Sequence, residues 1–218
     1  LTWCYEDAVW FIEQLTLPEH TEENPAPVLL EGYARLILRT IFRTGLVELL
    51  CLLPKGNGKT CIMAGLAIFH MLTVPSPQVF VAAADIEQAK EMFAFAQHFV
   101  ESEPELDALF IVTESTRVIR LRKGRGKLRV LASDSSKGKG KKHSYSPTLA
   151  LVDELHAHEN TAIYVALRSA MFKGKRAGIP GLEHGGIMAI ISTAGWSATS
   201  VLGELRAGCN KHGRHIGK

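Results

Sequence analysis

The sequence predicts an α/β fold in which a mostly parallel central sheet is covered by helices on both faces. The first observation is a set of short apolar runs, typical of buried parallel strands, at residues 49–54, 78–84, 148–152 and 187–191. The second is that segments with the apolar period of helices alternate with these runs. The chain has 218 residues, 46% of them hydrophobic, which is enough for one sizeable domain.

Residues 1–28 are expected to form a helical extension ahead of a main domain that spans residues 29–218. Apolar side chains at helical spacing predict a helix over residues 5–15. Its apolar face would consist of Ala8, Phe11, Ile12 and Leu15. A polar segment at residues 18–25 would then link this helix to the main domain.

The main domain is expected to open with a helix over residues 29–42 that leads into the strand at residues 49–54. That strand ends in a loop with two glycines, and a helix is predicted to follow over residues 61–72. Six residues form the loop and the start of this helix: Lys55, Gly56, Asn57, Gly58, Lys59 and Thr60.

Strand, glycine loop and helix N-terminus together predict a site for a phosphate group. Backbone N–H groups in such a loop and the positive end of the helix dipole both attract an anion. In this arrangement Lys59 would reach the β- and γ-phosphates of a nucleotide, and the Thr60 hydroxyl would bind Mg²⁺. The full pattern has a glycine five residues before Gly58, where this chain has Leu53, so an ordinary strand-to-helix turn is the alternative.

After the strand at residues 78–84, a helix is predicted over residues 86–100 with Asp85 as its N-cap. The next segment, residues 117–132, alternates apolar and basic side chains on either side of a Lys-Gly-Arg-Gly turn. This pattern predicts an inserted β-hairpin with one apolar face and one basic face.

Positive charge is concentrated between residues 117 and 142. This segment holds 11 Lys or Arg and one acidic residue, although the formal net charge of the chain is only +3. A basic segment on an otherwise acidic body favours a polyanionic partner, and a solvated hairpin face is the alternative. The candidates for nucleic-acid contact are Arg120, Arg122, Lys123, Arg125, Lys127, Lys139, Lys141 and Lys142.

The strand at residues 148–152 runs directly into two acids, Asp153 and Glu154. Carboxylates at the end of a buried strand are costly unless they meet a cation, although a solvated acidic turn is the alternative. In a phosphate-binding protein Asp153 would hold Mg²⁺ through water, and Glu154 would orient and deprotonate the attacking water. Because the carboxyl ends of parallel strands share one edge, the glycine loop and these acids are expected to meet there.

Helices are also predicted over residues 162–172 and 200–206, on either side of the strand at residues 187–191. The residues that directly follow this strand are Ser192, Thr193 and Ala194. Small hydroxyl residues at this position can sense a γ-phosphate and relay its loss. A turn built from small residues is the alternative.

Other features exclude some classes of protein. His156 and His158 have no further ligands at metal spacing, so they are interpreted as solvated or hydrogen-bonded loop residues. The four cysteines show no C-x-x-C spacing and are expected to be reduced thiols. No apolar run approaches the roughly 20 residues of a membrane span, and no secretory signal is visible. A cytoplasmic protein without a membrane partner is therefore expected.

These motifs resemble, in their order along the chain, those of the ATPase domain of tailed-phage terminase large subunits. The resemblance covers roughly residues 29–195. It is carried by residues 55–60, 83–89, 131–134, 153–156 and 192–195.

The resemblance implies an additional-strand, RecA-like P-loop ATPase that uses ATP and Mg²⁺ to pump double-stranded DNA into a procapsid. It assigns Lys59 and Thr60 to phosphate and Mg²⁺. Asp153 would complete the metal site, and Glu154 would be the catalytic carboxylate. The family's coupling motif corresponds to Ser192, Thr193 and Ala194. The implied partners are a phage portal and a small terminase subunit, with a homo-oligomeric ring assembled in the host cytoplasm.

The chain departs from the family pattern at three places. Lys55 stands where the family often has Arg, so phosphate would be sensed there without bidentate geometry. Ala34 occupies the position expected for an adenine-contacting Gln. The family's nuclease domain would follow the last motif, and no nuclease activity is expected of a piece that stops at Lys218.

Two other functions fit parts of the pattern. The sequence Asp-Glu-Leu-His also fits the DExH box of helicases, but 218 residues leave no room for the second RecA-like domain that a helicase needs. A nucleic-acid-binding module with a degenerate nucleotide site would instead use residues 117–142, and the missing glycine and Gln favour it slightly. Tight, Mg²⁺-dependent ATP binding would support the motor, and no ATP binding would support the module.

Overall fold

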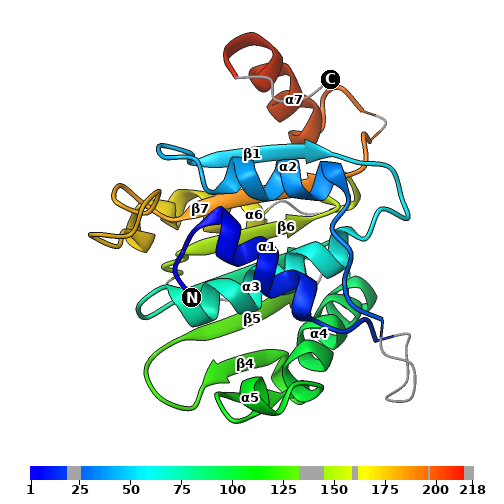
Figure 1. Ribbon diagram of the computed structural model, residues 1–218. Coiled ribbons are helices and arrows are strands. Elements are labelled where there is room, and N and C mark those ends of the chain that lie inside the picture. The colour runs from blue at the N-terminus through cyan, green and yellow to red at the C-terminus, as the bar shows by residue number, and fades with distance from the viewer. Residues whose placement is uncertain (19–25, 133–144, 159–161, 196, 214–218) are drawn as a thin grey trace.

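The computed structural model describes residues 1–18, 26–132, 145–158, 162–195 and 197–213. Within these residues a seven-stranded sheet has the order β1-β7-β6-β2-β5-β4-β3 (Figure 1). The strands are β1 (Glu48–Leu52), β2 (Gln78–Ala83), β3 (Phe110–Thr113), β4 (Val118–Leu121), β5 (Lys127–Ala132), β6 (Leu149–Asp153) and β7 (Ile187–Ser192).

Five adjacent strands, from β1 to β5 in the sheet order, run parallel, whereas β4 is antiparallel to both β5 and β3. Each residue of the central strands β6 and β7 is buried, as expected for apolar strands covered on both faces. The edge strand β1 is half-buried throughout. The α/β fold with a mostly parallel sheet is therefore confirmed.

Helices cover both faces of the sheet (Figure 1). The larger core lies between the sheet and α1 to α4, and the smaller one between the sheet, α6 and the start of α7. The helices are α1 (Tyr5–Gln14), α2 (Gly32–Ile41), α3 (Lys59–Thr73), α4 (Ile86–Glu101), α5 (Pro104–Asp107), α6 (Ala162–Ala170) and α7 (Val201–His212). Among these helices, none combines the length and the apolar content that a membrane crossing requires.

The first helix is part of the larger core. Ile12 of α1 is completely buried and packs on α3 at Gly65, where an added Cβ would lie 3.0 Å from the Ile12 Cγ1. Trp3, just before α1, stacks on Phe69 of α3. Glycine at position 65 thus lets the two helices approach closely.

Several boundaries differ from the sequence expectations. The second helix begins at Gly32 instead of residue 29, because the chain before it is extended and the Val28 N–H donates to the Leu15 carbonyl oxygen (2.8 Å). The last helix continues to His212 instead of ending at residue 206. Its final turns are polar, so they carry no apolar period, and Lys211 and His212 suit the negative end of the helix dipole.

The antiparallel end of the sheet agrees only in part with the predicted hairpin. The strands β4 and β5 do pair antiparallel, with Arg120 opposite Lys127. Leu128 and Val130 are buried and Lys127 and Arg129 lie on the other face, so the apolar and basic faces are present. However, β5 also pairs with β2, so the hairpin is continuous with the main sheet. The edge strand β3 is not predicted by the sequence, because four residues are too few to show a period.

Candidate active site

The glycine loop connects β1 to α3 at the carboxyl edge of the sheet. Gly56 and Gly58 have φ angles of +80° and +57°, a conformation that glycine adopts without strain. The Asn57 side chain donates to the Pro54 carbonyl oxygen (3.1 Å), and the Tyr33 hydroxyl donates to the Asn57 carbonyl oxygen (2.7 Å). The loop is therefore held by its own side chain and by α2.

This loop and the first turn of α3 line a cavity of about 400 Å³. Gly56, Asn57, Gly58, Lys59 and Thr60 all contribute to its wall, and Glu91 and Phe95 of α4 close another side. Since the first N–H groups of a helix have no intrahelical partner, the cavity is suited to an anion. Lys55 is exposed and is not among the residues that line this cavity.

The acidic residues are at the carboxyl end of β6, two strands away from β1 in the sheet. Asp153 is the last residue of β6, and Glu154 has a φ angle of +45°, which is unusual for a residue with a side chain. The Glu154 N–H donates to the Ile191 carbonyl oxygen (3.0 Å) of β7. This strained backbone turns the Glu154 carboxylate toward the glycine loop.

Lys59 and Glu154 form a direct ion pair. The Lys59 Nζ lies 2.6 Å from the Glu154 Oε1, although the two residues are 95 positions apart in the sequence. Their side chains are only 8% and 12% exposed. The sequence expectation that the glycine loop and the acids meet at one edge is therefore confirmed for this pair.

The other carboxylate oxygen of Glu154 is bound to the end of β7. The Thr193 N–H and hydroxyl donate to Oε2 at 2.7 and 3.1 Å, and the Ser192 hydroxyl lies 3.4 Å away. Burial raises the pKa of Glu154, but hydrogen bonds from Lys59 and Thr193 outweigh it and hold the pKa below its usual value. Glu154 is thus ionised and fixed at both oxygens.

Asp153 is in a different environment. Burial, and then the charge of Glu154, raise the pKa of its carboxyl group to about 7. Its Oδ1 is buried and has no hydrogen-bond partner within the described part of the chain. An orphaned buried oxygen of this kind is costly unless a cation reaches it.

These oxygen donors fit Mg²⁺. The ion takes few protein ligands, commonly one or two oxygens together with phosphate and water. The Thr60 hydroxyl and the Asp153 carboxylate are oxygens of the required type. The described residues contain no group of three or more His, Cys, Asp or Glu that would hold a different metal by protein ligands alone.

The remaining predicted residues are divided between this site, other parts of the surface and the part of the chain that the structure does not describe. Ser192 and Thr193 contact Glu154, but Ala194 is exposed and lines a separate hollow against α7. Arg120, Arg122, Lys123 and Arg125 are exposed at the antiparallel end of the sheet, and Lys127 is half-buried there. Lys139, Lys141 and Lys142 lie outside the described residues.

The sequence interpretation gives no site role to His156, yet this residue is in the site. Its Nδ1 lies 3.1 Å from the Glu154 Oε2 and 3.1 Å from the Ser192 hydroxyl. His158 is buried nearby, donates from Nε2 to the Asp153 carbonyl oxygen (2.8 Å), and has a pKa lowered by burial. The sequence signals for His156 are its place in the Asp-Glu-Leu-His motif and the pair of hydroxyl residues at the end of the neighbouring strand, which become its partners in the folded sheet.

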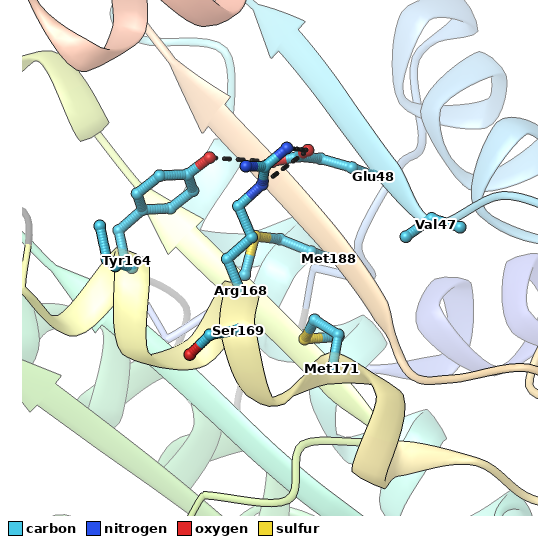
Figure 2. Close-up of a pocket in the computed structure, with 8 residues that line it drawn as sticks. Val47, Glu48, Tyr164, Arg168, Ser169, Met171 and Met188 are labelled. Atoms are coloured by element: carbon cyan, nitrogen blue, oxygen red, sulfur yellow. Dashed lines mark hydrogen bonds and ion pairs between the residues drawn. The ribbon is translucent and has the colours of Figure 1, made fainter.

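A second hollow, of about 410 Å³, lies between β1 and α6. Figure 2 shows Tyr164 and Arg168 of α6 pointing toward Glu48, with the Tyr164 hydroxyl 3.1 Å from the Glu48 Oε1. Arg168 donates twice to the Glu48 Oε2, each at 3.2 Å. Because Glu48 is the first residue of β1, this cluster is at the opposite end of the strand from the glycine loop. It ties the sheet edge to α6.

A glycine loop at a helix N-terminus, with a lysine and two carboxylates at the same edge of a parallel sheet, defines the class of P-loop nucleoside triphosphatases. A family model for the terminase large subunit ATPase domain matches residues 39–211. The chain therefore belongs to the family of terminase large subunit ATPase domains. Membership implies that it uses and hydrolyses ATP.

Solved structures of phage terminases have a similar fold. The large terminase of bacteriophage HK97 has a TM-score of 0.78 and 21% sequence identity, and the match covers 97% of this chain and 42% of that protein. A mutant ATPase domain of the Thermus phage P74-26 large terminase has a TM-score of 0.55 and 16% identity, covering 77% of this chain and 65% of that one.

The large terminase of the thermophilic bacteriophage D6E has a TM-score of 0.53 and 8% identity, covering 78% of this chain and 39% of that protein. This chain thus spans less than half the length of the HK97 and D6E large terminases. Comparison with curated protein sequences gives no match.

Proposed function

We propose that this chain is the ATP-hydrolysing motor domain of a viral large terminase, which drives double-stranded DNA into a procapsid. The observation that carries the proposal is the 2.6 Å contact between the Lys59 Nζ and the Glu154 Oε1. It brings the glycine loop and the acidic strand together as one site. The family match supports the motor over a helicase or a degenerate binding module.

The loop would bind the triphosphate of ATP. Gly56, Asn57 and Gly58 line the cavity, where their backbone N–H groups would bind phosphate oxygens, and Lys59 would exchange its bond to Glu154 for the β- and γ-phosphates. Lys55 would add a second cation at the rim. When bound, Mg²⁺ would neutralise negative charge on the phosphates, and Thr60 and Asp153 are the residues that would hold it.

Glu154 would act on the attacking water. Once Lys59 has left it, the Oε1 atom is free to accept a hydrogen bond and then a proton from that water. The Oε2 atom stays bound to Thr193, so the carboxylate keeps its orientation. Positioning and charge neutralisation carry most of the rate enhancement in phosphoryl transfer.

The end of β7 would sense hydrolysis. Ser192 and Thr193 contact the carboxylate that changes partner during the reaction, and Ala194 follows them into the hollow beside α7. A movement of Glu154 would therefore reach α7 through three consecutive residues. This supports the assignment of Ser192, Thr193 and Ala194 as the coupling motif.

The basic face of β4 and β5 is the proposed DNA contact. Arg120 and Lys127 are directly opposite each other, and Arg129 lies on the same face. Like charges at opposite positions are destabilising, and burial together with Arg129 lowers the pKa of Lys127. No ion pair neutralises these three side chains within the residues that the structure describes. A DNA backbone would supply the missing negative charge.

The family match supports a proposal for the domain organisation and the wider assembly. We propose that residues 29–218 form the ATPase domain and that residues 1–28 are an extension packed on it. The assembled protein would form a homo-oligomeric ring with a portal and a small terminase subunit in the host cytoplasm.

The test is ATP hydrolysis with Mg²⁺, measured with and without linear duplex DNA. We expect wild-type turnover to rise with DNA, and Lys59→Ala to reduce it by about 100-fold because the phosphates lose their cation. Lys90→Ala, which removes an exposed lysine of α4, is the matched control and should keep wild-type turnover. Full activity of Lys59→Ala would contradict the site, and the absence of any DNA effect would contradict the motor.

A further inference from the structure

The imidazole of His156 lies between the catalytic carboxylate and the end of β7. Its Nδ1 is 3.1 Å from the Glu154 Oε2, 3.1 Å from the Ser192 Oγ and 3.1 Å from the Thr193 Oγ1. Its Nε2 is 3.2 Å from the same Thr193 hydroxyl. The side chain is 20% exposed, so it is largely shielded from water.

The fold reserves space for this ring. Gly195, after the coupling motif, has a φ angle of +65°, and a Cβ added there would lie 3.0 Å from the His156 Cβ. Any side chain at position 195 would therefore press on the histidine. His156 itself belongs to a 3₁₀ turn over Leu155–Ala157, which brings it against the end of β7.

The contacts of Glu154 fall into two sets, one that breaks in the proposed reaction and one that is kept. In the proposed reaction Lys59 leaves the Oε1 atom for the phosphates, so this contact cannot orient the carboxylate during hydrolysis. The Oε2 contacts with Thr193 and His156 do not involve the phosphate-binding loop and remain. The His156 Nδ1 approaches Oε2 closely, and its hydrogen bonds are to the Ser192 and Thr193 hydroxyls. Because the Thr193 hydroxyl donates its single proton to Oε2, its oxygen accepts from His156, which thereby supports the donor that holds Glu154.

We propose that His156 is a positioning residue for ATP hydrolysis, which holds Glu154 in the orientation that activates water and joins it to Thr193 of the coupling motif. This role rests on the proposed function. His156 would act through Glu154, without contacting the nucleotide. Its loss should lower the turnover number and leave ATP affinity almost unchanged.

The experiment compares three substitutions in the full chain, with turnover measured in the presence of linear duplex DNA. His156→Ala removes the ring, His156→Asn keeps an amide at the position of Nδ1, and His156→Gln places its amide near Nε2. We expect kcat to fall about tenfold or more in His156→Ala and His156→Gln, and to be largely restored in His156→Asn. The dissociation constant of Mg·ATP, measured by equilibrium titration, should stay within about twofold of wild type in all three.

His184→Ala is the control, since His184 is an exposed loop histidine far from Glu154 in the sequence, and it should keep wild-type kcat. Wild-type kcat in His156→Ala, or equal losses in His156→Asn and His156→Gln, would overturn the role. The comparison of His156→Asn with His156→Gln tests the role even if the alanine variant is unstable, because both amide side chains fill the space of the ring. If the wild-type chain shows no ATP hydrolysis that depends on Lys59, the proposed function is contradicted as well. The outcomes above would contradict only the role of His156.

Discussion

At the scale of single residues, the site contains buried charged side chains that form an ion pair with each other. Lys59 and Glu154 are nearly buried, and removal of either leaves the other without its partner, which is more costly than losing an exposed ion pair. Glu154 also has a backbone conformation that most side chains avoid. Strain and buried charge at one position are typical of a functional residue and unusual for one that only stabilises the fold.

His70 provides a test of burial that is independent of the active site. It is completely buried in α3, its Nε2 lies 2.8 Å from the Thr148 Oγ1, and burial lowers its pKa to about 3. Below pH about 6.5 the unfolded chain binds a proton at His70 that the folded chain does not bind. The free energy of unfolding should therefore fall as the pH drops from about 6.5 toward 3.

We expect His70 to account for a decrease of about 2 kcal/mol in the free energy of unfolding between pH 7.5 and pH 5. The measurement is urea unfolding at both pH values, for wild type and for His70→Gln, which can still bond Thr148. The pH dependence should be smaller in His70→Gln by this amount. Identical pH dependence in the two proteins would show that His70 is not buried in its neutral form.

At the scale of elements, the parallel strands could be predicted because strands buried on both faces have short apolar runs, and their length and flanking turn residues distinguish them from a buried helix. Lys59, Asp153 and Glu154 could be placed at one edge because parallel strands end together. The edge strand β3 could not be predicted, since four residues at an edge show no period. The site position of His156 and the bond from Tyr33 to Asn57 could not be predicted, because their partners come close only in the folded chain.

The packing of α1 on α3 predicts that the N-terminal extension contributes to the stability of the whole domain. Ile12 is completely buried against Gly65, so Ile12→Ala should leave a cavity and reduce the free energy of unfolding by about 2–5 kcal/mol. Urea unfolding measures this change. Trp10→Ala, on the exposed face of α1, is the matched control and should cost much less. Equal and small effects of both substitutions would mean that α1 is not part of the cooperative core.

At the scale of the whole molecule, charge is unevenly distributed. In the strand order, β5 and β4 lie beyond β2 from β1, so the proposed DNA contact and the nucleotide site would be at separate places on one sheet. The sheet itself would then be the connection between them. The sequence predicts the charge concentration and a basic hairpin face, and the strand register places Arg120 directly opposite Lys127 on that face.

Replacing Arg120, Lys127 and Arg129 together by alanine should weaken DNA binding and change its salt dependence. The slope of log K against log salt concentration should become shallower by about 0.9 for each DNA phosphate that the variant no longer neutralises. Binding of labelled duplex DNA, titrated over a series of salt concentrations, gives this slope. The control is the replacement of Lys90, Lys173 and Lys211 by alanine, which should leave the slope near that of wild type. An unchanged slope in the Arg120, Lys127 and Arg129 variant would contradict the assignment of this face to DNA.

The most direct test of the central claim, that one nucleotide site is formed by Lys59 together with Asp153 and Glu154, is the ATP turnover of Glu154→Gln in the assembled, DNA-bound complex. Glutamine keeps the shape of the side chain but cannot accept a proton from water. We predict that turnover falls at least about 100-fold while Mg·ATP still binds. Turnover that persists at the wild-type rate would contradict the account.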